Sequence, residues 1–254
     1  MPASYAHYRF GKQMLSAMPA AQRQCVQRFR RLYDMGLYGP DIFFNYNPLM
    51  KTAVGDLGGV FHRQTGQEFF TRVCAQANTE AARAYLYGVL CHYCLDSNCH
   101  PYVQKQVDGG QVRHVELEAE FDRFLLDADG LPVPYDMSAH MKLTRGECVT
   151  VAGFYPPATP ANVNASVHGM ARLARFLAGK NRKRVEKLLA MTKKQVLQGQ
   201  LLPLTEADRW KRINSEMLAR YNRAVKQYPV LLAQLTAHMN SGEPLGEDFG
   251  ANFG

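Results

Sequence analysis

The sequence predicts an all-α protein with a single multi-helix domain, and three observations support this fold class. Apolar residues recur at helical spacing along most of the chain, no segment alternates like a strand between hairpin turns, and no internal repeat is visible. With 254 residues, of which 46% are hydrophobic, the chain can form one large core. We expect the domain to span residues 1–240 and the tail, residues 241–254, to be disordered because it shows no periodicity.

Three helices and one loop are expected in the amino-terminal third of the chain. Pro19 should open a helix that reaches about Met35, because proline is tolerated in the first helical turn, and Gly36 should end it. The segment 39–48 is rich in turn residues and is expected to be a loop that carries Asp41. The helices expected here are residues 1–18, 19–35 and 67–77.

The helix that begins at Thr79 is expected to be the centre of the fold. It is apolar nearly all round, which is typical of a helix buried on every side. Pro101 should end or bend it near Asn98 and turn His100 away from the face of the earlier turns. Beyond it we expect a proline-rich connection that forms a lid or rim, and a last helix interrupted by Pro229. The segments are helix 112–127, connection 128–164, and helices 165–178, 182–197 and 205–228.

Composition excludes some classes of protein. No apolar run reaches the roughly 18 residues of a membrane-spanning helix. The first residues lack the charged start and apolar centre of a signal peptide, so we expect a cytoplasmic protein with reduced thiols. Cys91, Cys94 and Cys99 are clustered, but no second CxxC completes a four-thiolate zinc site. We therefore expect these cysteines to pack in the core.

The formal net charge of +8 is concentrated in one segment. Residues 172–194 contain nine lysines and arginines against Glu186 alone, whereas the remainder of the chain is balanced. Such a segment could attract an anionic membrane surface or nucleic acid. The alternative is an ordinary solvated helix face.

Histidines and carboxylates recur at a spacing of four residues in the middle of the chain. His92, Asp96 and His100 follow this spacing, and so do His114 and Glu118. Residues four apart share one face of an α-helix, and imidazoles with carboxylates are ligands that suit zinc. Burying His92 and Asp96 among apolar residues is costly unless each has a strong partner, which a cation supplies. The alternative is a buried His–Asp pair beside an exposed His–Glu pair.

With His7, Asp41 and His62 before them, these residues form an ordered set that resembles the bacterial zinc-dependent phospholipase C family. More distantly, the set is similar to the zinc-dependent single-strand nucleases of the same fold. The resemblance covers about the first half of the chain and implies an all-α fold with a metal cluster in a cleft. It implies one ion held by His62, His92, Asp96 and Asp41, a second held by His100, His114 and Glu118, and a third held by His7 with Asp96 as a bridge.

Two features depart from the family pattern. Secreted members bind the third zinc through the amino group of a terminal tryptophan, whereas removal of Met1 here would leave Pro2. We therefore expect two or three zinc ions. Asp96 and His100 are also closer together than in the secreted enzymes, which would alter the second site. Glu118 favours the phospholipase branch, because the nucleases are expected to have aspartate there.

These patterns predict a zinc-dependent phosphoric-diester hydrolase that acts on phospholipid through a metal-activated water. The alternatives are a nuclease or soluble phosphodiesterase, and a non-catalytic metal-binding protein. Asp41 could be a ligand or the base for the water. The aromatic residues that follow it could hold a quaternary ammonium headgroup or simply pack in the core. The HD-domain phosphohydrolases are excluded, since no adjacent His-Asp doublet occurs.

Overall fold

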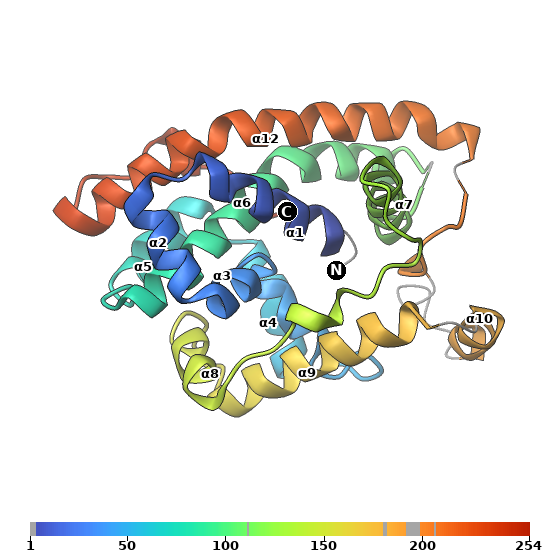
Figure 1. Ribbon diagram of the computed structural model, residues 1–254, viewed down its shortest axis with the longest axis horizontal. Helices are drawn as coiled ribbons and strands as arrows, with labels where there is room; N and C mark the ends of the chain where they lie inside the picture. Colours follow the sequence, from blue (N-terminus) through green and yellow to red (C-terminus); the bar gives the residue numbers. More distant parts are fainter. Residues whose placement is uncertain (1–3, 111, 180–181, 192–198, 206) are drawn as a thin grey trace.

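The computed structural model describes residues 4–110, 112–179, 182–191, 199–205 and 207–254. Regular structure in these ranges is helical, apart from one isolated β-bridge between Thr65 and Asn252. The longer helices pack around α6, with α12 along one side of it and α9 on the other side of the molecule (Figure 1). The expected all-α single domain is therefore confirmed. The α-helices are α1 (Ser4–Ala17), α2 (Ala20–Arg28), α3 (Arg30–Gly36), α4 (Ala53–His62), α5 (Gly66–Cys74), α6 (Glu80–Asp108), α7 (His114–Ala128), α8 (Arg145–Ala152), α9 (Pro160–Leu177), α10 (Arg182–Met191) and α12 (Asp208–Ser241); the 3-10 helices are η1 (Gly39–Asn45), η2 (Met137–His140) and η3 (Glu247–Phe249).

The central helix α6 begins at the expected residue and is enclosed as its composition predicts. The Thr79 hydroxyl accepts a hydrogen bond from the Ala82 N–H at 3.1 Å and caps the helix. Every residue from 84 to 96 is buried. The backbones of α3 and α6 touch, because a Cβ added at Gly88 would lie 2.3 Å from the Tyr33 carbonyl oxygen. Helix α6 thus carries its polar residues through the middle of the core.

Two prolines expected to interrupt helices lie inside continuous ones. Helix α6 runs through Pro101 to Asp108, and α12 runs through Pro229 to Ser241, so the expected end of α6 near Asn98 is wrong. A proline within a helix costs roughly 3 kcal/mol or more. Buried side chains beyond each proline outweigh this cost, because each contributes about 1.5–3 kcal/mol. These side chains are Tyr102 and Val103 in α6 and Leu231, Leu232 and Leu235 in α12.

Two short helices arise where none was expected, and one expected helix is divided. Helix α4 lies after the expected loop, and α8 lies within the proline-rich connection. Threonine side chains cap both, with Thr52 accepting from the Gly55 N–H at 3.0 Å and Thr144 forming a capping box with Glu147. The helix expected over residues 19–35 is broken at Phe29, which separates α2 from α3.

The carboxyl-terminal tail is ordered, so the expected disorder of residues 241–254 is wrong. Phe249 and Phe253 are fully buried and pack against Phe70 on α5 and Tyr93 on α6. The Gly66 N–H donates to the Ala251 carbonyl at 2.8 Å. The tail shows little periodicity overall, but two of its aromatic residues, Phe249 and Phe253, lie four positions apart. Their burial orders the tail.

Candidate metal centre

Eight histidine and carboxylate side chains expected as metal ligands meet at one place in the fold. They come from five elements that are far apart in the sequence: His7 from α1, Asp41 from η1, His62 from α4, His92, Asp96 and His100 from α6, and His114 and Glu118 from α7. All except His100 and His114 are buried. All except His92 line a cleft of about 510 Å³. The cleft gives the centre access to solvent and to a ligand.

Asp96 lies at the middle of this cluster. Its Oδ1 is 3.1 Å from His7 Nε2 and 3.7 Å from His100 Nε2. Its Oδ2 is 3.0 Å from His92 Nε2 and 3.9 Å from His62 Nε2. Four imidazoles therefore surround one carboxylate, an arrangement that suits a carboxylate shared between cations.

The first group of potential ligands is His62, His92 and Asp96, whose nearest ligand atoms lie within 4.8 Å of one another. The Asp41 Oδ1 adjoins the group, 3.0 Å from His62 Nε2. His62 Nδ1 donates to the Gly58 carbonyl at 2.7 Å, and His92 Nδ1 donates to the Leu37 carbonyl at 3.2 Å. With the proton held on Nδ1, the Nε2 lone pair of each ring faces the cluster, as a metal ligand requires.

Gly39 allows Asp41 to reach this group and was not singled out in the sequence. Its φ of +48° lies in the left-handed region that favours glycine. A Cβ at Gly39 would lie 2.6 Å from the His92 ring, so only glycine lets η1 pass directly over the imidazole. In the sequence, the signal for this arrangement is the Gly-Pro pair before Asp41, a pair that is also typical of a turn.

The second group is His100, His114 and Glu118. The Glu118 Oε1 is 3.1 Å from His100 Nε2 and 3.0 Å from His114 Nε2. His114 opens α7, so it lies one turn from Glu118, and its side chain is 41% exposed. Because α6 continues through Pro101, His100 stays 3.7 Å from Asp96 and joins the two groups.

The third group contains His7, Asp41 and His92, and its atoms also lie within 4.8 Å of one another. The His7 ring stacks on the His92 ring with centroids 4.5 Å apart. The third zinc site was expected at His7 with Asp96 as a bridge, and His7 here adjoins both Asp96 and the first group. Helix α1 begins at Ser4, and Pro2 lies outside the described residues.

Several buried atoms of the cluster fit a bound cation. Within the described residues, His7 Nδ1, His92 Nε2 and Asp96 Oδ2 have no hydrogen-bond partner. The last two face each other at 3.0 Å but not in hydrogen-bond geometry. An unsatisfied buried polar atom costs about 1–3 kcal/mol, and coordination removes that cost. Imidazole nitrogen with carboxylate oxygen is the donor set that zinc takes.

The electrostatics of the cluster keep the carboxylates ionised at neutral pH. Burial raises the pKa of Asp96, but the surrounding imidazoles outweigh it and hold this pKa well below its usual range. His100 has the largest effect among them. Burial also raises the pKa of Glu118, but His114 and His100 outweigh it and lower this pKa to about 2. At Asp41, His62 outweighs burial and also lowers the pKa. Ionised carboxylates are ready to bind a cation.

The aromatic residues after Asp41 divide between the core and the cleft. Phe43 is fully buried and packs on Tyr155, which agrees with core packing. Phe44 is 41% exposed, lines the cleft and lies 5.5 Å from the His62 ring. Tyr46 is partly buried and is not among the residues that line the cleft. Phe44 therefore supplies the aromatic surface next to the metal ligands.

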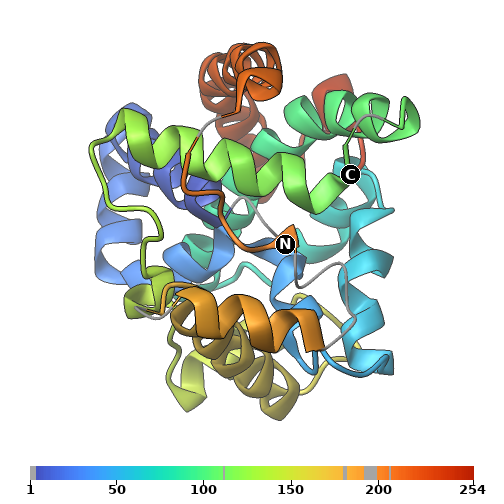
Figure 2. The same cartoon turned by 90° about the vertical axis from the view of Figure 1, so that its right-hand side faces the viewer.

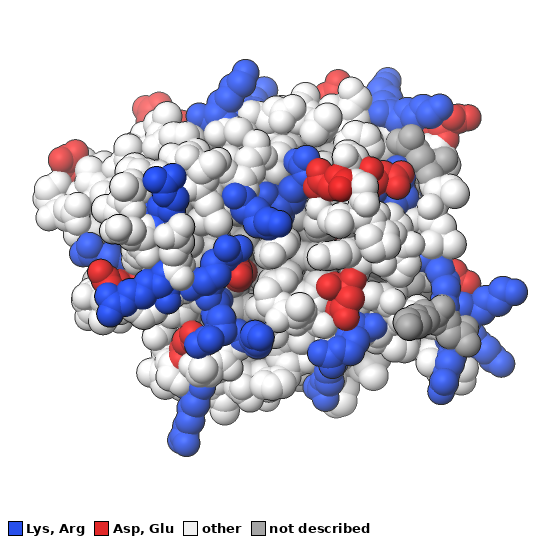
Figure 3. Space-filling model, viewed as in Figure 1, with Lys and Arg blue, Asp and Glu red and all other residues white. Residues whose placement is uncertain are grey.

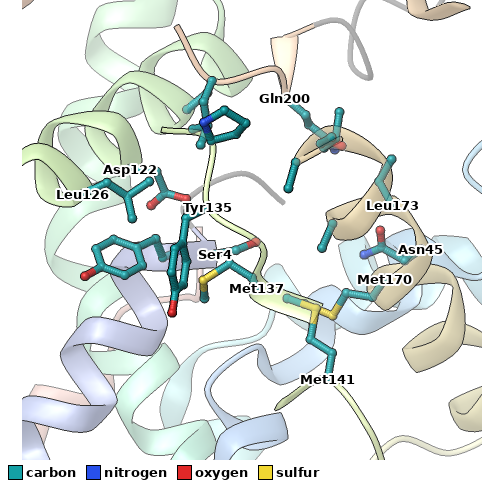
Figure 4. A pocket seen from close by; sticks show the side chains of 17 residues that line it. Ser4, Asn45, Asp122, Leu126, Tyr135, Met137, Met141, Met170, Leu173 and Gln200 are labelled. Atoms are coloured by element: carbon teal, nitrogen blue, oxygen red, sulfur yellow. Dashed lines mark hydrogen bonds between the residues drawn. The ribbon is translucent and has the colours of Figure 1, made fainter. Parts of the chain in front are cut away.

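A second, smaller pocket of about 80 Å³ adjoins the metal cleft (Figure 4). Met137, Met141 and Met170 point toward its interior in the close view. The two spaces share wall residues, since Asn45, Leu173 and Gln200 line both. A largely apolar pocket thus lies next to the polar metal cleft.

The remaining cysteines and histidines lie outside the cluster. Cys91, Cys94 and Cys99 are free and buried, and none belongs to the three candidate ligand groups of the described residues. His140 receives a hydrogen bond from the Tyr38 hydroxyl and stacks on Tyr8 with centroids 4.1 Å apart. His168 on α9 is exposed and His238 on α12 is partly buried, and Nδ1 of each bonds to a nearby backbone carbonyl.

Comparison with known proteins agrees with the geometry. The family model described as zinc dependent phospholipase C matches residues 6–153, which is more than half of the chain and contains all eight candidate ligands. No curated protein and no solved structure matches the chain. The chain therefore belongs to the zinc-dependent phospholipase C family, whose members are phosphodiester hydrolases.

Proposed function

We propose that the metal centre holds two or three zinc ions and hydrolyses the phosphodiester bond of a phospholipid. The observation that carries this proposal is the convergence of eight potential ligands, with Asp96 at their middle, beside an accessible cleft. Zinc, when bound, lowers the pKa of water to roughly 7 and withdraws charge from a phosphate. The residues of the chain hold the ions, orient the substrate and shape the cleft.

The surroundings of Asp41 favour one of its two possible roles, metal ligand or general base. Its carboxylate lies 3.0 Å from His62, and its pKa is held well below the usual range. Asp41 also belongs to a group of potential ligands with His7 and His92, and this position supports ligation over proton abstraction. Arg63 is exposed, lines the same cleft and offers a cation to the phosphate.

The apolar pocket supports a lipid substrate over a nucleic acid. It adjoins the metal cleft, and three methionines and four leucines are among the residues that line it. Such a surface accepts the hydrocarbon part of a lipid, whereas a nuclease needs surfaces that bind bases and phosphates. We propose that the glyceride side of the scissile bond lies against this pocket.

Metal analysis combined with two substrates tests the proposal. The purified protein should contain two or three zinc ions and should release a phosphorylated headgroup from phosphatidylcholine. Met170→Trp should fill the apolar pocket and reduce lipid hydrolysis about 10-fold or more while zinc content is unchanged, since a methylene-scale misfit alone costs 10–200-fold. Faster cleavage of single-stranded DNA than of lipid would indicate the nuclease alternative, and zinc without either activity would indicate a metal-binding protein.

We further propose that an anionic membrane surface binds beside the cleft mouth. Pro48 and Leu173 line both the metal cleft and a neighbouring groove that reaches Leu188 on α10. Leu49 and Met50 are 56% and 65% exposed at this edge. Apolar side chains next to cations are the features that bind anionic lipid headgroups.

The cations of this surface come from α9 and α10. Lysine and arginine side chains gather at the α10 end of the molecule in the space-filling view, and α10 stands at the front of the turned view (Figures 2 and 3). Lys180, Lys193 and Lys194 of the expected basic segment lie outside the described residues. The described basic residues are Arg172, Arg175, Arg182, Lys183, Arg184 and Lys187.

Charge reversal tests this surface. Lys183→Glu with Lys187→Glu should weaken binding to phosphatidylserine vesicles by roughly 10-fold or more, since each basic residue contributes about 1 kcal/mol near such a surface. Arg182 is not used, because it bonds to Glu186 and to the Leu202 carbonyl. Arg223→Glu with Lys226→Glu on α12 provides a control with the same charge change. Equal binding by both variants would favour a solvated helix face, and a loss of DNA binding alone would favour nucleic acid.

The cellular location is part of the same proposal. We propose that the protein acts in the cytoplasm, where its six cysteines would remain the free thiols of the structure. Cell fractionation tests this directly, and recovery of the protein outside the cytoplasm would contradict it. In the described part of the chain, no helix combines the length and apolarity needed to cross a bilayer.

A further inference from the structure

Residues 242–254 form a carboxyl-terminal strap that packs against the metal centre. We propose that it positions the zinc ligands, with Phe253 as the residue that sets their orientation. This inference rests on zinc binding by the cluster, as proposed above. The strap lies outside residues 6–153, the part of the chain that matches the family model.

Phe253 contacts three of the potential ligands. Its carbonyl accepts a hydrogen bond from His100 Nδ1 at 2.8 Å. Its N–H donates to the His62 carbonyl at 3.1 Å. Its ring lies 6.2 Å from the His62 ring and 6.0 Å from the His92 ring. Phe253 thus contacts His62 on α4 and two potential ligands on α6, His92 and His100.

The strap is fixed before it reaches the ligands. The Tyr93 hydroxyl lies within hydrogen-bond distance of the Asp248 carbonyl at 3.1 Å and the Ala251 carbonyl at 3.2 Å. Ala251 also accepts from the Gly66 N–H at 2.8 Å. The Phe249 ring stacks on Tyr93 with centroids 5.7 Å apart. These contacts hold Phe253 in one place, so it can hold the histidines.

The bond to His100 gives the strap a specific chemical effect. A carbonyl can only accept, so Nδ1 of His100 keeps its proton, and Nε2, 3.1 Å from Glu118 Oε1, is the nitrogen that can give up its proton to bind a cation. His62 and His92 receive the same support from Gly58 and Leu37, which lie in the region that matches the family. For His100 the supporting carbonyl comes from the strap.

Close packing maintains this arrangement. Gly254 has a φ of +127°, and a Cβ there would lie 1.4 Å from His100 Nδ1. The strap backbone therefore passes directly against the imidazole and leaves no room for the ring to turn away. Phe253 itself is fully buried, so its own position is fixed by the core.

A matched pair of variants separates positioning from general stability. Phe253→Ala and Phe249→Ala each remove a fully buried aromatic ring from the strap, but Phe249 makes no ring contact with the candidate ligands. Both should lower the melting temperature of the metal-free protein. Only Phe253→Ala should weaken zinc binding, by about 10–100-fold in competition with a chromophoric chelator, which is the usual effect of losing support for a ligand.

Two further variants keep the test decisive if Phe253→Ala folds poorly. Phe253→Leu retains the apolar anchor and the backbone carbonyl, and should bind zinc within about 3-fold of the natural protein, less than the usual cost of losing a supporting partner. Removal of residues 252–254 keeps the Ala251 bonds but deletes the carbonyl, and should weaken zinc binding as Phe253→Ala does.

Equal zinc affinity in the Phe253→Ala and Phe249→Ala proteins, or in the shortened and natural proteins, would overturn the positioning role. The readout is zinc affinity and not hydrolysis. A protein that binds zinc tightly, responds to Phe253→Ala and yet cleaves no lipid would contradict the proposed function alone.

Discussion

Two groups of ligands share the carboxylate of Asp96 but are enclosed differently. In the closed group, His62, His92 and Asp96, each side chain is at most 9% exposed, and both imidazoles are anchored by nearby carbonyls. The open group is His100, His114 and Glu118, and the His114 side chain is 41% exposed. Its anchoring carbonyl at His100 comes from the distant strap.

The difference shows how burial and neighbouring charge act on the same residue type. Burial lowers the pKa of His92 to about 4, so this ring stays neutral and available to a metal. Burial also acts on His100, but Asp96 and Glu118 outweigh it and raise its pKa to about 10. The closed group thus offers a neutral, enclosed His92 as a potential ligand, whereas the open group includes the exposed His114 at the cleft.

The largest effect should come from breaking the link between the groups. Asp96→Asn keeps the shape but removes the negative charge that both groups share, so zinc content should fall and hydrolysis should drop by about 1,000-fold or more, as when a catalytic unit is broken. Metal analysis and a phosphatidylcholine assay measure both. Full zinc content with full activity would return the cluster to a buried His–Asp pair.

Removing one histidine from each group should sharpen the comparison. His92→Ala should lose zinc and also lower the melting temperature of the metal-free protein by about 5–10 °C, because it leaves a cavity in a fully buried site. His114→Ala should lose about one zinc ion with a change in unfolding free energy within about 0.5 kcal/mol, as at exposed positions. Calorimetry with metal analysis measures both quantities. Equal destabilisation would show that the groups are enclosed alike.

A smaller effect is expected at the edge of the closed group. Asp41→Asn should weaken zinc binding about 10–100-fold if Asp41 is a ligand supported by His62, and hydrolysis should recover at high zinc concentration. Turnover that stays low at saturating zinc would instead identify Asp41 as the base. Chelator competition and a zinc titration of activity distinguish these outcomes.

The smallest effect concerns His140, a histidine outside the cluster that provides a reference for His92. Burial, and then the charge of Arg30, lower its pKa to about 4. A histidine with a lowered pKa adds stability above its unfolded value of about 6.5, and that stability is lost as pH falls through about 4. Phenylalanine takes up no proton, so lowering the pH from about 7 to about 5 should reduce the melting temperature of His140→Phe by a few degrees less than that of the natural protein. The conversion is about 2–4 °C per kcal/mol of unfolding free energy. Parallel melting curves would contradict this.

The residues of the candidate site could be predicted because they follow local rules. The four-residue spacing from His92 to His100 and from His114 to Glu118 fixes which side chains share a helix face. The buried helix was visible in its apolar composition, and the order of the ligands indicated the family that the matched region confirms. The ligand roles and the number of zinc ions stay predictions.

The same local rules misjudged the elements that depend on distant contacts. Pro101 and Pro229 are helix breakers in isolation, yet both helices continue because apolar residues beyond them are buried against other helices. Gly39 had the composition of a turn, and its approach to the His92 ring exists only once α6 is placed. Secondary-structure propensity is a weak prior that tertiary packing overrides.

By itself, the sequence determined an all-helical chain, its central buried helix and the set of imidazoles and carboxylates that face one another. These follow from periodicity and from the cost of burying charge without a partner. Only the tertiary structure decided that the strap is ordered and that the Phe253 carbonyl bonds to His100. That contact joins residues 153 positions apart, and no local pattern encodes it, because burial of Phe249 and Phe253 against Phe70 and Tyr93 creates it.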